Sequence, residues 1–367
     1  MGKYSSSPLW SSVTPIPLDD GSNYYSPNSS SRPTEGDWKN ETYPLATISY
    51  SDEYTEATAY LRAVMAANEM SERALELTAD VIMLNPAHYT VWLYRAKIIQ
   101  ALNKDLHEEI AWLNKISLKH LKNYQIWHHR QLIMSSRTAF PHLPPSEQDF
   151  LTEMFALDSK NYHVWTYRHW LVRHFSLWDS TRELHDVEAL IAADVRNNSA
   201  WNHRWVLRFG PRDERLLDSG VPNPTADRSS GGHRGRLDVV EEDLVDAEIA
   251  YAQGKIVLAP ENRSAWAYAR GVLRAAGRPM AELKMFASRF VDEEVENGVA
   301  VDYRVKSSLA VEWLADVFAE EAREGGEPTE SRKCKTEAVK MLNLLKEKYD
   351  PIRKNYWDYR ICMIENY

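Results

Sequence analysis

The feature that most constrains this chain is a tryptophan followed three residues later by an arginine, repeated along its length. The pairs are Trp92/Arg95, Trp127/Arg130, Trp165/Arg168, Trp201/Arg204 and Trp357/Arg360, with Trp266/Arg270 as a variant one residue longer. The first four tryptophans are separated by 35, 38 and 36 residues. Such a period is typical of stacked units that contact mainly their neighbours. The sequence therefore predicts a repeat array rather than one closed core.

Each period holds two segments with the apolar spacing of a helix. Ser71 suits the N-cap of the first segment, and Asn85-Pro86 ends it, so that a second helix carrying Trp92 is expected to begin there. The same plan predicts helices over 108–120, 124–134, 147–157 and 162–174. We therefore expect an all-α fold, a right-handed alpha-alpha superhelix (solenoid) of about seven antiparallel helical hairpins, like a tetratricopeptide crescent.

Two segments interrupt the pattern. Residues 1–45 are rich in Ser and Pro and are predicted to form a disordered tail before a helical-repeat domain over 50–367. Residues 211–237 are predicted to be an inserted loop, because removing them brings Trp201 and Trp266 back to about one period. Trp313 lies where a degenerate repeat is required before Trp357.

Composition excludes several classes of protein. A net charge of −9 argues against nucleic-acid binding, and only two cysteines, Cys334 and Cys362, indicate a reducing compartment. No apolar stretch is long enough to span a membrane, so we expect a cytoplasmic protein.

The chain has no phosphate loop, His-Glu-x-x-His or nucleophile elbow, and we predict neither a metal site nor a self-sufficient enzyme. Gly2 and Ser6 match a loose myristoylation pattern, which we interpret as chance.

The Trp/Arg pairs are interpreted as scaffold. Residues three apart lie on one helix face, where the indole fills the space between hairpins and the guanidinium pairs with a carboxylate or loop carbonyl of the next unit. The adjacent His128 and His129 are interpreted as packing residues, because neighbouring side chains on a helix diverge. The residues given a structural role are Trp92, Trp127, Arg130, Trp165, Arg168, Trp201, Arg204 and Trp266.

The variation between repeats lies five residues before each tryptophan. Three consecutive central repeats have Lys122, Lys160 and Arg196 there, whereas the flanking repeats have Ala87, Glu261 and Ile352. Equivalent positions line up in a solenoid, and helix N-termini add unpaired N–H groups. A row of this kind suits phosphate, diphosphate or carboxylate; the alternative is that these are solvated surface charges. The polar and aromatic neighbours are Asn123, Tyr124, Gln125, Asn161, Tyr162 and His163.

The ordered series of units resembles the alpha subunit of protein farnesyltransferase, shared with protein geranylgeranyltransferase type I. The resemblance rests on Lys122-Asn-Tyr-Gln-Ile-Trp-His-His-Arg, Lys160-Asn-Tyr-His-Val-Trp, Arg196-Asn-Asn-Ser-Ala-Trp and Ile352-Arg-Lys-Asn-Tyr-Trp. It covers nearly everything after the tail. The resemblance implies a heterodimer with a farnesyltransferase or geranylgeranyltransferase type I beta subunit, which holds the zinc, and magnesium for the farnesyl reaction.

The same resemblance implies the reaction and the residues. A farnesyl or geranylgeranyl group moves from its diphosphate to a cysteine near a C-terminus of CaaX type. Lys122 corresponds to the lysine that stabilises the leaving diphosphate, and Gln125 to the residue that binds the substrate carboxylate, with Tyr124 beside it. Asn161, Tyr162 and His163 correspond to the next loop toward the prenyl diphosphate, supported by Lys160. Two alternatives stay open: the alpha subunit of the Rab-type geranylgeranyltransferase, and a non-catalytic tetratricopeptide-like scaffold that binds peptides.

Overall fold

The structure is a computed structural model that describes residues 2–18, 48–210, 242–296, 299–324 and 327–366. The described fold is all-α apart from one short hairpin, which confirms the predicted fold class. The chain divides within one helix into two compact units, Met1–Arg168 and His169–Tyr367. Each unit is described by itself.

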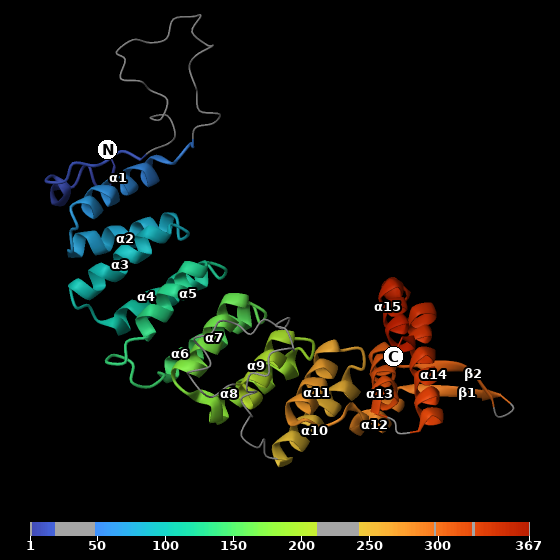
Figure 1. The fold of residues 1–367 in the computed structure, drawn as a ribbon. Helices are drawn as coiled ribbons and strands as arrows, with labels where there is room; N and C mark the ends of the chain where they lie inside the picture. The colour runs from blue at the N-terminus through green and yellow to red at the C-terminus, as the bar shows by residue number, and fades with distance from the viewer. Residues whose placement is uncertain (1, 19–47, 211–241, 297–298, 325–326, 367) are drawn as a thin grey trace, which may run out of the picture. The chain divides into compact units, whose positions relative to one another are not determined.

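The first unit is a succession of helices that follow one another in pairs (Figure 1). Helix α2 packs on α3, and α4 packs on α5. The helices expected over 108–120, 124–134, 147–157 and 162–174 are all found, with ends that shift by two residues or fewer. The elements are η1 (Pro8–Trp10), α1 (Asp52–Ala66), α2 (Glu72–Leu84), α3 (Tyr89–Ala101), α4 (Leu106–Lys119), α5 (Tyr124–Met134), α6 (Pro145–Leu157) and α7 (Tyr162–His174).

The second unit continues the helix pairs. Its helices are α8 (Thr181–Ala193), α9 (Asn198–Phe209), α10 (Glu242–Leu258), α11 (Arg263–Ala276), α12 (Lys284–Ser288), α13 (Ser308–Glu324), α14 (Pro328–Leu344) and α15 (Lys354–Glu365). Shorter elements are η3 (Leu177–Asp179), η5 (Met280–Leu283), the π-helical turn η6 (Leu345–Tyr349) and η7 (Pro351–Arg353). The predicted inserted loop over 211–237 lies outside the described residues. After it, α10 and α11 pack on each other as the next pair.

The degenerate repeat expected at Trp313 carries an insertion that the sequence did not predict. Trp313 lies in α13 and is buried, and its ring centroid lies 5.5 Å from that of Trp266, with the two ring planes tilted at 47°. Between α12 and α13 the chain forms an antiparallel hairpin of β1 (Val291–Glu296) and β2 (Val299–Val305), in which Val291 faces Val305. The periodicity of tryptophan is thus kept, while the first helix of this repeat is shortened to η5 and α12.

Asparagine and serine side chains set the helix starts. Ser71 Oγ accepts from the backbone N–H of Ala74 at 3.2 Å, as its predicted capping role requires. The helix carrying Trp92 begins at Tyr89 rather than at Pro86, because Asn85 and Pro86 form a turn closed by His88 N–H donating to the Asn85 carbonyl. The second helices α5, α7, α9 and α11 each follow an asparagine whose side-chain oxygen accepts from the first turn, namely Asn123, Asn161, Asn197 and Asn262.

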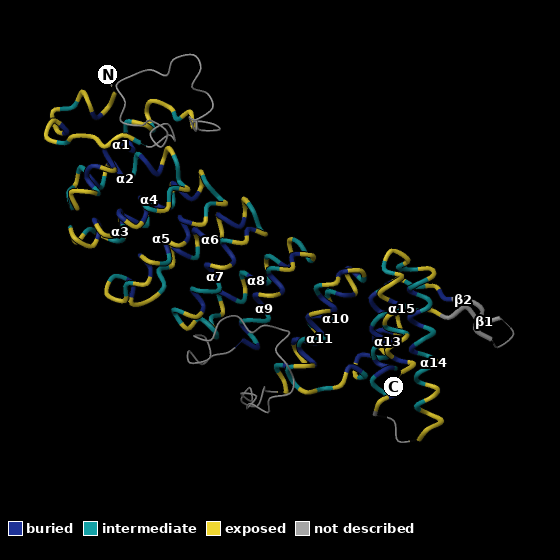
Figure 2. Tube along the Cα trace, turned by 45° about the horizontal axis from the view of Figure 1, so that its top comes forward, coloured by how far each residue is buried: buried dark blue, intermediate teal, exposed yellow. Residues whose placement is uncertain are grey.

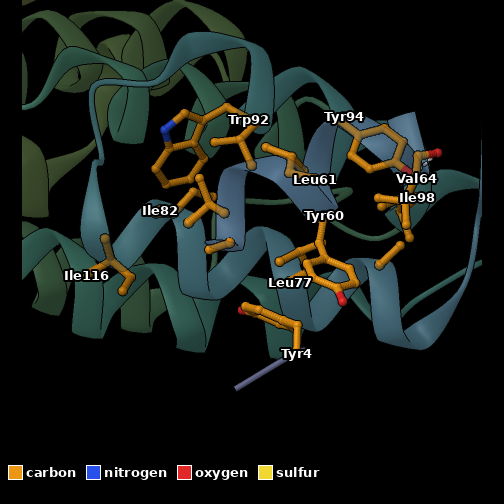
Figure 3. Packing of buried hydrophobic residues seen from close by; sticks show 14 of the residues in the cluster. Tyr4, Tyr60, Leu61, Val64, Leu77, Ile82, Trp92, Tyr94, Ile98 and Ile116 are labelled. Carbon is orange, nitrogen blue, oxygen red and sulfur yellow. Dashed lines mark hydrogen bonds between the residues drawn. The ribbon is translucent and has the colours of Figure 1, made fainter. Parts of the chain in front are cut away.

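The buried residues form a layer along the inside of the helix pairs, with exposed residues on the outer turns (Figure 2). In the first unit a core of aliphatic and aromatic side chains joins α1 to α5 (Figure 3). Trp92, Leu77 and Ile126 lie in this core and are at most 3% exposed. Each hairpin therefore buries its apolar face against the next, as expected for a repeat array.

Residues 2–18 are packed against the first helices, whereas a disordered tail was predicted over residues 1–45. Tyr4 and Trp10 are 4% and 5% exposed and contact each other and Tyr60, each pair with ring centroids at 5.3 to 5.5 Å. Figure 3 shows Tyr4 beside Tyr60. The prediction failed here because two aromatic side chains outweigh a polar composition once an apolar surface is available. Residues 19–47 lie outside the described part.

Candidate functional site

The arginines of the Trp/Arg pairs form bidentate ion pairs with glutamates of the following hairpin. Arg95 bonds Glu109 of α4 at 2.8 and 2.7 Å, and Arg130 bonds Glu147 of α6 at 2.7 and 2.5 Å. Arg204 repeats the arrangement with Glu248 of α10 at 2.6 and 2.9 Å. These three glutamates are buried, so the paired charges stabilise the junction between hairpins rather than a surface.

In four repeats a second side chain, two residues after the tryptophan, bonds a buried glutamate. His129 lies 2.9 Å from Glu109, Tyr167 donates to Glu147 at 2.8 Å, and Tyr268 donates to Glu248 at 2.7 Å. His203 and Glu183 form the corresponding pair at 2.7 Å. In all four the two partners are 20 residues apart, and this spacing is the sequence signal that could have identified the buried glutamates.

The pKa of Glu109 shows which effect dominates at these junctions. Burial acts to raise the pKa of this carboxyl, but the bonds from His129 and Arg95 outweigh it, and the net shift is downward. The carboxylate therefore stays ionised at neutral pH. His129 is thus a buried partner of a structural glutamate, and its neighbour His128 is exposed.

The charge pattern reverses in the repeat of Trp313. The position three residues after this tryptophan holds Asp316 instead of an arginine. Arg270 Nη2 lies 2.5 Å from Asp316 Oδ2, and Arg360 Nη2 donates to Oδ1 of the same carboxylate. One aspartate thus serves the arginines of both neighbouring repeats.

A hollow of about 610 Å³ in the second unit is lined by arginines, including Arg270, Arg274 and Arg278. Two of these are already paired: Arg270 with Asp316, and Arg278 with Asp246 and Glu282. Most of the positive charge is thus balanced by carboxylates, which leaves little of it for an external anion.

The basic residues predicted to face an anion stand in exposed turns. In the first unit, Lys122 precedes α5 and Lys160 precedes α7, and both are exposed. No described residue pairs with the Lys122 ammonium group. Arg196, also exposed, holds the equivalent position before α9 in the second unit. Exposed cations next to helix N-termini can bind an anion, because the free N–H groups there add to the positive potential.

The aromatic residues at these turns point to solvent in the isolated chain. Tyr89, Tyr124 and Tyr162 each lie three residues before a tryptophan and are 63%, 59% and 75% exposed. His163, beside Tyr162, is half-buried. Three large aromatic rings at equivalent positions of consecutive repeats form a surface suited to a protein partner.

Two of the predicted substrate-binding residues are buried. Gln125 is 7% exposed in the first turn of α5. Asn161 is 3% exposed and both ends of its amide are used: Oδ1 accepts from His163 N–H at 3.0 Å, and Nδ2 donates to the Leu121 carbonyl at 2.9 Å. The sequence could not separate Asn161 from its exposed neighbours, because an N-cap and a ligand contact use the same residue type.

Among the described residues there is no group of three or more His, Cys, Asp or Glu side chains that could hold a metal ion. Cys334 is half-buried with its thiol 3.9 Å from Glu321, and Cys362 is exposed. The residues that the structure describes therefore do not fit a zinc site. No helix in the described ranges combines the length and apolarity needed to cross a bilayer.

Comparison with known proteins shows which family has these repeats. The pattern of the protein prenyltransferase alpha subunit repeat matches residues 71–102, 106–137, 144–175 and 180–209, which are the pairs α2/α3 to α8/α9. The class defined by fold and turns is thus the prenyltransferase alpha subunit type of helical repeat protein.

Individual relatives are similar to this chain over almost its whole length, and they identify the type of alpha subunit within this class. The farnesyltransferase/geranylgeranyltransferase type-1 subunit alpha of Candida albicans is 35% identical over 90% of this chain and 95% of its own. The Pisum sativum subunit is 31% identical over 96% and 92%. A solved structure, Candida albicans protein geranylgeranyltransferase-I complexed with GGPP, matches with a TM-score of 0.72, 33% identity and coverage of 96% and 97%. The chain belongs to the family of alpha subunits shared by protein farnesyltransferase and geranylgeranyltransferase type 1.

Proposed function

We propose that this chain acts with a beta subunit of the farnesyltransferase or geranylgeranyltransferase type I kind, and that the pair prenylates proteins at CaaX-type C-termini. The substrate cysteine first gives up its thiol proton to solvent. Its thiolate sulfur then attacks C1 of the prenyl chain, the bond from C1 to the diphosphate oxygen breaks, and diphosphate leaves with the electron pair. The full-length similarity to the type-1 alpha subunits supports this proposal.

The observation that carries the residue assignment is the free ammonium group of Lys122. It is exposed, has no partner among the described side chains, and stands directly before the N-terminus of α5. A cation held there stabilises negative charge as it develops on the leaving diphosphate. Lys160 supports the same field from the next turn.

The exposed tyrosines support a role in partner and substrate contact. Tyr124 and Tyr162 flank the two lysines, and Tyr89 extends the row by one repeat. Burying three such rings against a beta subunit releases the water around them, which favours the heterodimer. Exposed rings also explain why we expect the lone subunit to be poorly soluble.

Gln125 remains our proposal for the residue that binds the substrate carboxylate. Its amide N–H groups are donors of the right kind, and the side chain would have to turn outward from its buried position when substrate binds. The zinc that activates the cysteine is proposed to belong to the beta subunit, with magnesium beside the diphosphate. We derive no step of this chain through either metal.

Replacing Lys122 with alanine tests the assignment. In the purified heterodimer we expect kcat to fall by roughly 10²- to 10³-fold with either prenyl diphosphate, while the heterodimer still forms. Lys119→Ala is the matched control, since Lys119 is an exposed lysine three residues earlier in α4. If Lys122→Ala and Lys119→Ala turn over alike, the role of Lys122 is lost. If the wild-type heterodimer binds no prenyl diphosphate, the proposed prenyltransferase activity is ruled out.

A further inference from the structure

The turn that carries Lys122 is held in place differently from its counterparts. The turn before Trp201 shows the full set of side-chain bonds. Arg196 N–H donates to Asp194 Oδ1 at 2.9 Å, and the Trp201 indole N–H donates to the Val195 carbonyl at 2.8 Å. Asn262, from the next hairpin, donates to the same Val195 carbonyl at 2.6 Å. Three side chains thus fix this turn from both sides.

Two of these three bonds are missing at the Lys122 turn. The position of Asp194 is taken by His120, which has no side-chain oxygen to accept from the backbone of Lys122. The indole N–H of Trp127 is buried and has no hydrogen-bond partner in the structure, although Trp92, Trp165 and Trp266 all donate to the carbonyl six residues earlier. Within the described residues, the side chain that bonds the Leu121 carbonyl is that of Asn161, at 2.9 Å.

Asn161 is itself rigidly held. Its Oδ1 caps α7 by accepting from His163 and Val164 N–H at 3.0 and 3.4 Å, and the side chain is 3% exposed. Because Oδ1 is fixed by the cap, the direction in which Nδ2 can donate is fixed as well. The hydrogen bond from Nδ2 therefore ties the Leu121 carbonyl, one residue before Lys122, to the start of α7.

We propose that Asn161 is the positioning residue for Lys122 and that it acts through the Leu121 carbonyl. This proposal rests on the function proposed for Lys122. The lysine stabilises charge at the diphosphate only while its backbone is held at a fixed place, since a group that must be moved into position loses much of its effect. The turn before Trp201 keeps two of its side-chain bonds when one is removed. The Lys122 turn has one, and Asn161 supplies it.

Asn161→Ser separates the two tasks of this residue. Serine is a good N-cap, so α7 keeps its start, but its short side chain cannot reach Leu121. In the heterodimer we expect kcat to fall about tenfold, with the KM for a CaaX peptide little changed. Asn161→Asp also keeps the cap and loses the donor, and is expected to lower kcat as well. Asn262→Ser is the matched control, because Trp201 and Asp194 still hold its target turn; its kcat should stay within about twofold of wild type.

Two further measurements ask whether the effect passes through Lys122. In the Lys122→Ala background, Asn161→Ser should lower kcat no further, and amide hydrogen exchange at residues 121–123 should be faster in Asn161→Ser than in Asn262→Ser. An equal loss of kcat in both backgrounds, or unchanged exchange at the turn, overturns the inference. If Lys122→Ala is fully active, the role proposed for Lys122 fails instead, and faster exchange at 121–123 still supports positioning of the turn by Asn161.

Discussion

At the scale of single residues, the buried glutamates decide how hairpins join. Glu109 is bonded by Arg95 of the preceding hairpin and by His129 of its own, and the three bonds are 2.7 to 2.9 Å long. A buried carboxylate is tolerated only when it is paired and hydrogen-bonded in this way. The tryptophan that gives the repeat its period is thus accompanied by an ion pair that sets how consecutive hairpins dock.

Glu109→Gln should destabilise the first unit by about 3 kcal/mol, because it leaves Arg95 buried without its charge partner. The pKa of Glu109 is lowered in the folded state from its usual 4.5. Its contribution to stability is therefore complete above about pH 4.5 and is lost as the pH falls through the lower folded-state value. Unfolding of the heterodimer measured from pH 7 to pH 3 should show a shallower acid loss in the variant.

The matched control is Glu108→Gln, which removes an exposed carboxylate next to the buried one. Surface changes of this kind are usually worth less than 0.5 kcal/mol. A variant at Glu109 that is as stable as the Glu108 control would show that the ion pair does not hold the junction.

The residue scale also shows what the sequence could and could not predict. The period of tryptophan predicted the helices and their faces, because both depend on local spacing. The partners of Arg95 and Arg204 are 14 and 44 residues away, and nothing local distinguishes Glu109 from Glu108. The basic turns were found by comparing repeats, whereas the burial of Gln125 and Asn161 depends on packing that no single repeat contains.

At the scale of elements, the segment 2–18 is a cap on the first helices. Its backbone wraps the carboxylate of Glu56, which accepts from Ser5 N–H at 2.9 Å, and Lys3 and Tyr4 both bond Asp80 at 2.6 Å. Burial acts to raise the pKa of Glu56, but the backbone bonds outweigh it and lower the value. Terminal repeats need such a cover, because one face of the first hairpin has no neighbour.

Trp10→Ala should release this cap. The indole packs on Tyr60 and under Arg73, with its ring 5.2 Å from the guanidinium carbon, and truncating such a side chain costs about 3 kcal/mol when the site does not collapse. We expect faster hydrogen exchange over residues 4–13 and a lower Tm. Leu9→Ala, at a residue 57% exposed, is the control. Unchanged exchange in Trp10→Ala would mean that the segment does not depend on this anchor.

At the scale of the whole molecule, stability in a repeat array is a sum of local terms, and each unit should respond to its own junctions. Asp316→Asn removes the charge that Arg270 and Arg360 share. We expect residue-resolved hydrogen exchange to rise in α11, α13 and α15 and to stay unchanged in α2 to α5. Asp316→Arg should be worse than Asp316→Asn, because it places three guanidinium groups together. A uniform rise across both units would contradict local stability.

The reversed charge at Asp316 also limits how such a chain can gain or lose repeats. Between Trp92 and Trp165 a hairpin could be duplicated or deleted, and the arginine of one repeat would still meet a glutamate of the next. Deleting the Trp313 repeat would instead bring Arg270 and Arg360 face to face with no acid between them. We therefore expect the C-terminal repeats to be exchangeable only as a block, so that chimeras between family members should exchange α11 to α15 together.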